Sequence, residues 1–444
     1  MKNVTRRTCV AALALAVLAS VLMGSARGAQ VTLDVGLGKP TLLAGEKQTT
    51  FLKVGLTGFQ WQEPTDRAPV NIALVIDKSG SMTGRKIEKA KEAAIMAVDR
   101  LDSKDIVSVV AYDHNIRVLV PATKVSEKAA IRAGINELSA GGNTALFGGV
   151  SKGAAEVRKF LVKDRVSRVI LISDGLANVG PSSPTQLGQL GSSLIKEGIS
   201  VTTIGLGLDY NEDLMMELAQ KSDGNHYFAE NATDLARIFK GELGDVLSVC
   251  AQEVTITIKC ADGIRPVRVL GRDADITGQN VVTVLNQLYS GQEKYVVLEV
   301  EVPATPEDKT RPIASVLVTY ANMATKTSDK LTSTVAARFT KAKELVEKNE
   351  NVKVMIAVTV QIAAATNKEA TALRDAGKIE EAKKLLIGNG AFLNANGLKY
   401  RSKVLLEQGV YNLSNAEVLD DVNWRNTRKS MRYHQNASEM QQQH

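Results

Sequence analysis

Histidine, cysteine and aromatic residues are scarce in this chain of 444 residues. The sequence has four histidines and three cysteines, and aromatic residues make up 4% of it. Zinc centres are built mainly from histidine and cysteine, so the sequence does not predict one. No arrangement of histidine, cysteine or lysine supplies the general base that a hydrolase needs. The apolar fraction of 44% is ordinary for a globular protein and excludes collagen-like, coiled-coil and disordered chains.

Long apolar runs are also rare, and only residues 9–23 approach the length that spans a bilayer. This run follows a basic start at residues 1–7 and precedes the small residues 24–26, which is the pattern of a secretory signal peptide. We therefore expect residues 1–28 to be a cleaved signal peptide. An uncleaved membrane anchor is the alternative, and the small residues after the run favour cleavage.

Without the predicted signal peptide, the chain would be only weakly basic and would keep two cysteines. Residues 1–28 contain four basic residues and no acidic one, so their removal lowers the formal charge from +7 to +3. This small charge does not favour a nucleic-acid partner. The remaining Cys250 and Cys260 could form a disulfide in an oxidising compartment or stay as two free thiols, because sequence alone does not show their geometry.

Between residues 70 and 247, apolar runs alternate with amphipathic stretches. The runs VNIALVID, DIVSVVAYD, VSRVILISDG and GISVTTIGLGL are almost continuously apolar, as in strands that are buried on both faces. Helix-like segments separate them, including residues 128–138, 144–160 and 233–247. The pattern predicts an α/β domain with a doubly wound, mostly parallel sheet.

The segments on either side of this domain alternate with a period of two. Residues 30–65 and 250–337 therefore predict short antiparallel strands. Three short strands alone make a marginal domain, so we expect both segments to form one β-sandwich into which the α/β domain is inserted. Two separate β modules are the alternative.

The last hundred residues lose the strand pattern. Residues 341–420 predict a helical region, and residues 421–444 are a polar tail that we expect to be disordered. The tail has four basic residues that could contact an anionic cell envelope, although solvation is the expectation we favour: Arg425, Arg428, Lys429 and Arg432.

Oxygen-bearing side chains follow two predicted strands of the α/β domain. Asp77, Ser79 and Ser81 come directly after VNIALVI, and Asp174 comes after VILIS. Thr144 follows a Gly-Gly turn at a predicted helix start. Ligands of open parallel sheets bind beyond the carboxyl ends of the strands, so we expect these five side chains to converge.

Carboxylates and hydroxyls are hard ligands, which select Mg²⁺, Mn²⁺ or Ca²⁺ over zinc or copper. Neutral hydroxyls coordinate a cation without cancelling its charge, so the cation can take another carboxylate from outside. The alternative for residues 77–81 is a turn or a helix cap. Thr144 and Asp174 together favour the metal site.

Three parts of this pattern resemble the metal-ion-dependent adhesion site of von Willebrand factor type A domains. They are D-x-S-x-S at residues 77–81, the threonine at 144 and D-G at residues 174–175. The resemblance covers roughly residues 70–247. It implies the Rossmann-like fold of that family and a protein of the bacterial secreted type. It also implies that Ser79, Ser81 and Thr144 bind the metal, that Asp77 and Asp174 bind it directly or through water, and that the partner supplies an acidic side chain.

Other polar residues at predicted strand ends carry less information. Asp113 and His114 follow the strand VSVVAY, and Asp209 follows IGLGL. Loop residues of these types are most often solvated, so we expect no site role for them.

From these observations we expect a secreted, periplasmic or cell-surface protein that is not an enzyme. It would bind Mg²⁺, or alternatively Mn²⁺ or Ca²⁺, and capture an Asp or Glu of a protein partner. We expect no catalytic residues, no nucleic-acid partner and no transmembrane segment in the mature chain. The alternatives are a structural component of a cell-envelope assembly with a stabilising metal, and an enzyme that uses the metal for hydrolysis.

Overall fold

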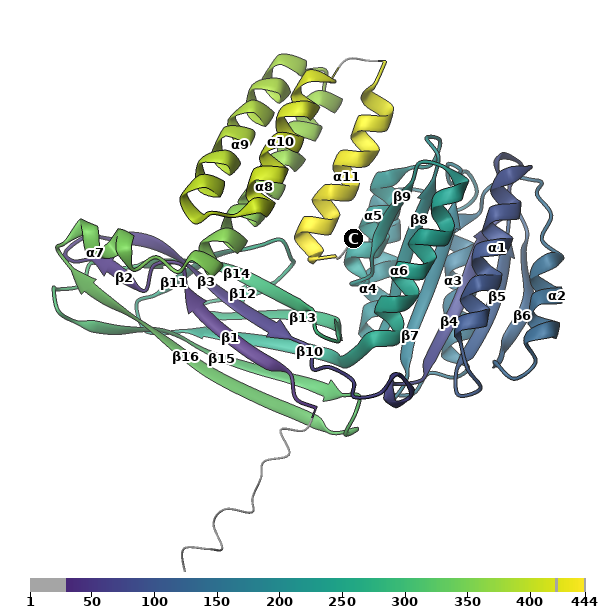
Figure 1. Cartoon of the computed structure of the whole chain (residues 1–444), viewed down its shortest axis with the longest axis horizontal. Coiled ribbons are helices and arrows are strands. Elements are labelled where there is room, and N and C mark those ends of the chain that lie inside the picture. The colour runs from purple at the N-terminus through teal and green to yellow at the C-terminus, as the bar shows by residue number, and fades with distance from the viewer. Residues whose placement is uncertain (1–28, 420–421, 443–444) are drawn as a thin grey trace, which may run out of the picture.

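The computed structural model describes residues 29–419 and 422–442. The predicted signal peptide, residues 1–28, lies outside the described residues. Figure 1 shows an α/β domain beside two mostly antiparallel sheets, with a group of helices packed against both. Among the described residues, no helix is long and apolar enough to cross a membrane.

The α/β domain contains one six-stranded sheet in the order β6-β5-β4-β7-β8-β9. Its strands are β4 (Val70–Asp77), β5 (Ile106–Tyr112), β6 (Ile116–Lys124), β7 (Val166–Ser173), β8 (Ile199–Leu206) and β9 (His226–Ala229). All neighbours are parallel except β5 and β6, which are antiparallel. The predicted mostly parallel sheet is therefore confirmed, whereas β6 is an additional edge strand.

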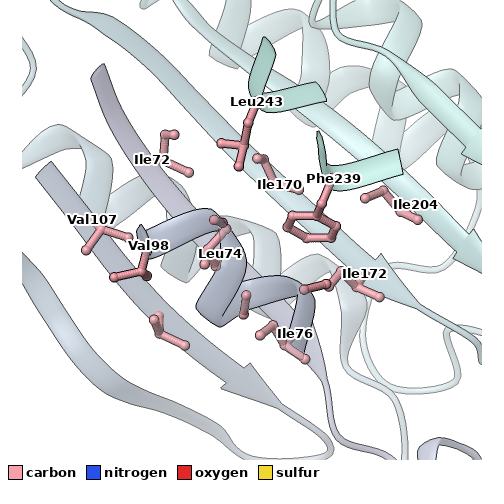
Figure 2. Close-up of a cluster of buried hydrophobic side chains, with 14 of the residues drawn as sticks. Ile72, Leu74, Ile76, Val98, Val107, Ile170, Ile172, Ile204, Phe239 and Leu243 are labelled. Carbon is pink, nitrogen blue, oxygen red and sulfur yellow. The ribbon is translucent and has the colours of Figure 1, made fainter. Parts of the chain in front are cut away.

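Helices cover both faces of this sheet, as the alternating sequence pattern predicted. They are α1 (Arg85–Arg100), α2 (Lys128–Asn136), α3 (Leu146–Arg158), α4 (Pro184–Lys196), α5 (Glu212–Lys221) and α6 (Leu235–Ser248). In β4, Ile72 and Leu74 belong to the apolar core beneath α1 and α6, and Ala73 and Val75 belong to the core beneath α3 to α5. Figure 2 shows the first of these cores. Both faces of β4 are buried, which explains its unbroken apolar run.

The two mostly antiparallel sheets combine strands from both sides of the α/β domain, and β16 and β2 pair in parallel. They are ordered β1-β3-β14-β11 and β12-β13-β10-β15-β16-β2. The strands before the domain are β1 (Thr32–Leu37), β2 (Thr41–Leu43) and β3 (Gln48–Thr57). Those after it are β10 (Val249–Cys260), β11 (Arg265–Leu270), β12 (Asp275–Thr277), β13 (Asn280–Tyr289), β14 (Glu293–Val302), β15 (Thr310–Asn322) and β16 (Ser328–Thr340). One apolar core contains residues of both sheets, and its Cys250 and Cys260 are free, buried thiols.

Five helices follow the sheets. They are α7 (Lys343–Lys348), α8 (Val352–Asp375), α9 (Ile379–Tyr400), α10 (Lys403–Glu417) and α11 (Trp424–Met440). Helix α8 contacts β3, β11 and β14, and α11 contacts α8, α5 and β9. In Figure 1, α11 therefore lies between the other helices and the α/β domain.

The prediction of a disordered, solvated tail at residues 421–444 is wrong for its described part. Helix α11 buries Met431 and Met440 and forms ion pairs with the α/β domain. Arg428 pairs with Glu212 and with Asp213, whose Oδ2 lies 2.6 Å from the guanidinium. This polar segment, which the sequence alone predicts to be solvated, forms a helix here because its basic side chains pair with acidic side chains of α5.

Candidate metal centre

Three loops meet at the carboxyl edge of the parallel sheet. The loop after β4 carries Ser79 and Ser81, the loop before α3 carries Thr144, and the loop after β7 carries Asp174. Backbone hydrogen bonds hold these loops together. Gly80 N donates to Gly142 O at 3.0 Å, and Asn178 N donates to Thr144 O at 3.1 Å. The Asn178 side chain also accepts from Thr144 N at 2.9 Å.

The side chains from these loops converge on one point. Ser79 Oγ and Ser81 Oγ are 3.1 Å apart, and the Ser81 hydroxyl donates to Asp174 Oδ1 at 2.7 Å. A Cβ added to Gly175 would lie 3.1 Å from Thr144 Oγ1, 3.3 Å from Ser81 Oγ and 3.6 Å from Ser79 Oγ. Glycine at position 175 therefore leaves open a space that three hydroxyl oxygens surround.

Asp77 lies behind this cluster and holds the first loop. One carboxylate oxygen accepts from Ser79 N at 2.8 Å, and the other accepts from the Ser173 hydroxyl. Burial raises the pKa of the Asp77 carboxyl above its ordinary value, although hydrogen bonds from Ser173 and Ser79 oppose the increase. The negative charge of the nearby Asp174 also raises the pKa of Asp77, because it disfavours the charged form of Asp77.

Two lysines that the sequence analysis did not select belong to the surroundings of this cluster. Lys86, in the first turn of α1, forms an ion pair with Asp174, and Lys78 forms one with Asp113. The expectation that Asp113 is solvated is wrong, because the residue is buried and also accepts from Asn115 N at 2.6 Å. A lysine at the start of a helix carries no sequence signal for the direction in which its side chain points.

The remaining loop residues lie on the surface. His114 is exposed, with Nδ1 3.6 Å from Asp113 Oδ1. Asp209 is exposed as expected, although it accepts from Arg425 Nη2 of α11 at 2.9 Å. Ala145 N donates to Asp113 O at 2.8 Å and Gly141 N donates to Lys78 O at 2.6 Å, so Asp113 and Lys78 lie beside the loop of Thr144. Asp209 instead contacts α11.

The arrangement fits a hard divalent cation. Three neutral hydroxyls surround one space, and the Asp174 carboxylate is hydrogen-bonded to one of them, Ser81. All four groups are oxygen ligands of the kind that Mg²⁺ and Ca²⁺ prefer. Across residues 29–419 and 422–442, no group of three or more His, Cys, Asp and Glu side chains is arranged to hold a metal. The role of the five predicted residues as metal ligands stays a prediction.

Residues 71–241 match the von Willebrand factor type A domain family. An uncharacterized protein from Synechocystis is 30% identical over 242 residues, which cover 52% of this chain and 57% of that protein. Inter-alpha-trypsin inhibitor heavy chain H2 of Mus musculus is 33% identical over 171 residues, 36% of this chain and 18% of its own length. E3 ubiquitin-protein ligase WAV3 of Arabidopsis thaliana is 25% identical over 264 residues, 56% of this chain and 33% of the ligase. Each match thus spans only part of the relative.

Solved structures share the fold over most of the chain. A von Willebrand factor type A protein from Catenulispora acidiphila has a TM-score of 0.69 at 17% identity, with 85% of this chain and 89% of that chain covered. The ArnB paralog VWA2 from Sulfolobus acidocaldarius has a TM-score of 0.64 at 17% identity, with coverage of 93% and 98%. The family match and the shared fold agree on the central unit, and this chain therefore contains a von Willebrand factor type A domain.

Proposed function

We propose that this chain is an exported binding protein that captures an acidic residue of a protein partner through a divalent cation. Ser79, Ser81, Thr144 and Asp174 would hold Mg²⁺, or alternatively Mn²⁺ or Ca²⁺, and Asp77 would fix the first loop. The observation that carries the proposal is the convergence of three hydroxyl oxygens on the space beside Gly175. The Asp174 carboxylate adjoins this space through its hydrogen bond with Ser81.

The chemistry of the ligand set favours capture of a carboxylate. A bound divalent cation supplies a positive centre that attracts an anionic oxygen. Ser79, Ser81 and Thr144 donate lone pairs but carry no charge, so they leave this attraction largely intact. Ser81 is exposed whereas Ser79 and Thr144 are buried. A partner would therefore approach from the side of Ser81.

The lysines beside the centre and the buried histidine of β9 favour binding over catalysis. Lys86 and Lys78 are both engaged in ion pairs with buried carboxylates. His226 is fully buried and shares a hydrogen bond with Thr203 Oγ1, and burial lowers its pKa to about 3. The relative WAV3 is named as an enzyme, but the aligned part covers 33% of its length. Metal-dependent hydrolysis of phosphate or peptide esters would contradict the proposal.

Calorimetric titration tests the metal centre directly. Mg²⁺, Mn²⁺ and Ca²⁺ are titrated into chelator-treated protein that begins at residue 29, and circular dichroism monitors folding. We expect one binding site that Asp174→Ala and Ser79→Ala abolish while the fold is kept. Ser193→Ala is a matched control, because Ser193 is exposed on α4 and bonds only to Leu190 O.

Two outcomes would redirect the proposal. No binding to the wild-type protein would mean that the hydroxyls only stabilise the loops. Unfolding on metal removal would favour the alternative of a structural component of an envelope assembly, because an adhesion site should lose its ligand and remain folded. Export is tested separately by sequencing the N-terminus of protein recovered from outside the cytoplasm, where a start near residue 29 is expected.

A further inference from the structure

Large apolar side chains are exposed at two opposite edges of the type A domain. In the described part of this domain, five of them are at least 36% exposed: Ile116, Phe160, Val162, Leu176 and Leu208. Phe160 and Val162 precede β7 and so lie at the amino edge of the parallel strands. The other three lie at the carboxyl edge, where the candidate metal centre is.

Leu176 and Leu208 border one side of the centre. Leu176 directly follows Gly175 and is 59% exposed. Leu208 is 38% exposed and follows Gly207, where an added Cβ would lie 3.9 Å from Lys86 Nζ. Because Lys86 pairs with Asp174, both leucines belong to loops next to the candidate ligands.

Ile116 borders the other side. It begins the antiparallel strand β6 opposite Tyr112, the last residue of β5, and is 40% exposed. A Cβ added to Gly148 would lie 2.5 Å from Ile116 Cδ1, so Ile116 packs against the first turn of α3. Thr144 lies just before this turn. We call Ile116, Leu176 and Leu208 the apolar rim.

Paired charges accompany the apolar rim. The Lys86 side chain is 32% exposed, and Arg425 of α11 donates to Leu208 O at 3.2 Å. The two carboxylates of the centre, Asp77 and Asp174, are fully buried. Lys86 is paired with Asp174 and Arg425 with the exposed Asp209, so the positive charge that attracts an acidic group would come from the proposed cation. The surface around the centre is apolar, which complements the apolar neighbours of such a group.

We infer that the partner segment carries an Asp or Glu flanked by aliphatic or aromatic side chains, in an exposed loop or extended stretch of a protein. This inference rests on the proposed function, because the cation would receive the carboxylate. The apolar neighbours would contact Leu176 and Leu208 on one side and Ile116 on the other. Interfaces commonly combine a few buried apolar anchors with a polar contact that fixes orientation. A purely acidic polymer would leave the apolar rim in water.

A displayed library of random cyclic heptapeptides tests this specificity. The library is selected on the immobilised full chain in Mg²⁺ and eluted with chelator. We expect enriched peptides to place Asp or Glu next to Leu, Ile, Val or Phe. The strongest peptide is then synthesised, and its affinity is measured by fluorescence polarisation.

Substitutions at the two edges of the sheet provide matched variants. Leu176→Ser and Leu208→Ser should each weaken peptide binding about tenfold, with the calorimetric affinity for Mg²⁺ unchanged, because neither side chain is a proposed ligand. Phe160→Ser and Val162→Ser remove comparable exposed apolar groups at the opposite edge and should leave the peptide affinity unchanged. Equal losses at both edges would overturn the inference.

The outcomes separate this inference from the proposed function. Chelator-eluted peptides that contain Asp or Glu without apolar neighbours would overturn the inference and leave the metal-dependent capture intact. Peptides that bind equally with and without chelator would overturn the proposed function and the inference with it. Selection of peptides that lack acidic residues would have the same consequence.

Discussion

The space beside Gly175 gives the sharpest test of the metal centre. Gly175→Ala adds one Cβ, which would lie 3.1 Å from Thr144 Oγ1 and 3.3 Å from Ser81 Oγ. Non-bonded heavy atoms prefer separations of about 3.5 to 4.0 Å, so these oxygens would have to move by a few tenths of an ångström. The backbone at Gly175 does not have a positive φ, and alanine is conformationally acceptable there.

The expected magnitude follows from how strictly each cation fixes its ligands. Mg²⁺ requires near-octahedral oxygens at about 2.0 to 2.1 Å, whereas Ca²⁺ accepts about 2.3 to 2.6 Å in flexible geometry. Displacing groups that orient metal ligands typically costs about 10-fold to 100-fold in affinity. We expect Gly175→Ala to weaken Mg²⁺ binding by this factor and Ca²⁺ binding by less. The free energy of unfolding without metal should change by less than about 1 kcal/mol.

Calorimetry with both cations, together with urea unfolding in chelator, measures these quantities. Gly141→Ala is the matched control, since it lies in the neighbouring loop with nothing within 4 Å of an added Cβ. This control should bind Mg²⁺ like the wild type. Wild-type affinity for Mg²⁺ in a folded Gly175→Ala protein would refute the reasoning, because a cation held by these hydroxyls could not tolerate the added group.

Three further variants test the surroundings of the centre. Lys86→Met removes the ammonium that pairs with Asp174 and, for an ion pair worth about 1 kcal/mol, should tighten Mg²⁺ binding about fivefold in calorimetry; unchanged or weaker binding contradicts this. Arg168→Met leaves the fully buried Glu242 without its 3.0 Å partner and should lower the free energy of unfolding by about 3 to 5 kcal/mol in urea; a loss below about 1 kcal/mol argues against it. Burial, and secondarily the charge of Glu242, raises the pKa of Asp245 to about 6. The neutral carboxyl is therefore compatible with the fold below about pH 4, and the protein loses stability as the pH rises through 6 and this buried group becomes charged. In urea unfolding, the free energy of unfolding of Asp245→Asn should therefore exceed that of the wild type by about 1 to 2 kcal/mol at pH 8 and equal it at pH 4. An equal gain in stability at both pH values would count against the raised pKa of Asp245.

The parallel strands were predictable because burial on both faces requires an almost continuous apolar run. Strand β4 is buried at every position, and the sequence marks its end with Asp77. Strand β6 was not predicted because it is a half-exposed edge strand with Pro121 in its interior, so it lacks such a run. Helix α11 was missed because its order depends on partners such as Glu212, 216 residues before Arg428.

The candidate site, like the fold, has features that the sequence predicted and features that it did not. The positions of Ser79, Ser81, Thr144 and Asp174 at strand and loop ends were sufficient to predict that they converge, because parallel strands end at a common edge. The ion pair of Lys86 with Asp174 could not be predicted, because it depends on the rotation of α1 about its axis. The exposure of Leu176 and Leu208 likewise depends on loop conformations that a sequence does not specify.

The insertion of the type A domain has a consequence for the order in which this chain acquires structure. Strands β1 and β3 pair with each other, but Lys53 of β3 bonds to Glu293 of β14, 240 residues later, so the pairing of β3 with β14 requires most of the chain. Gly58 N donates to Gln292 O at 3.1 Å, and Ser290 N donates to Ser248 O at 2.9 Å, so the two ends of the inserted domain lie side by side. If that domain folds first, the loop to be closed shrinks from about 240 residues to about 10, which lowers the entropic cost by about 3 kcal/mol. The inserted domain then serves as a folding template that brings distant strands within reach of each other.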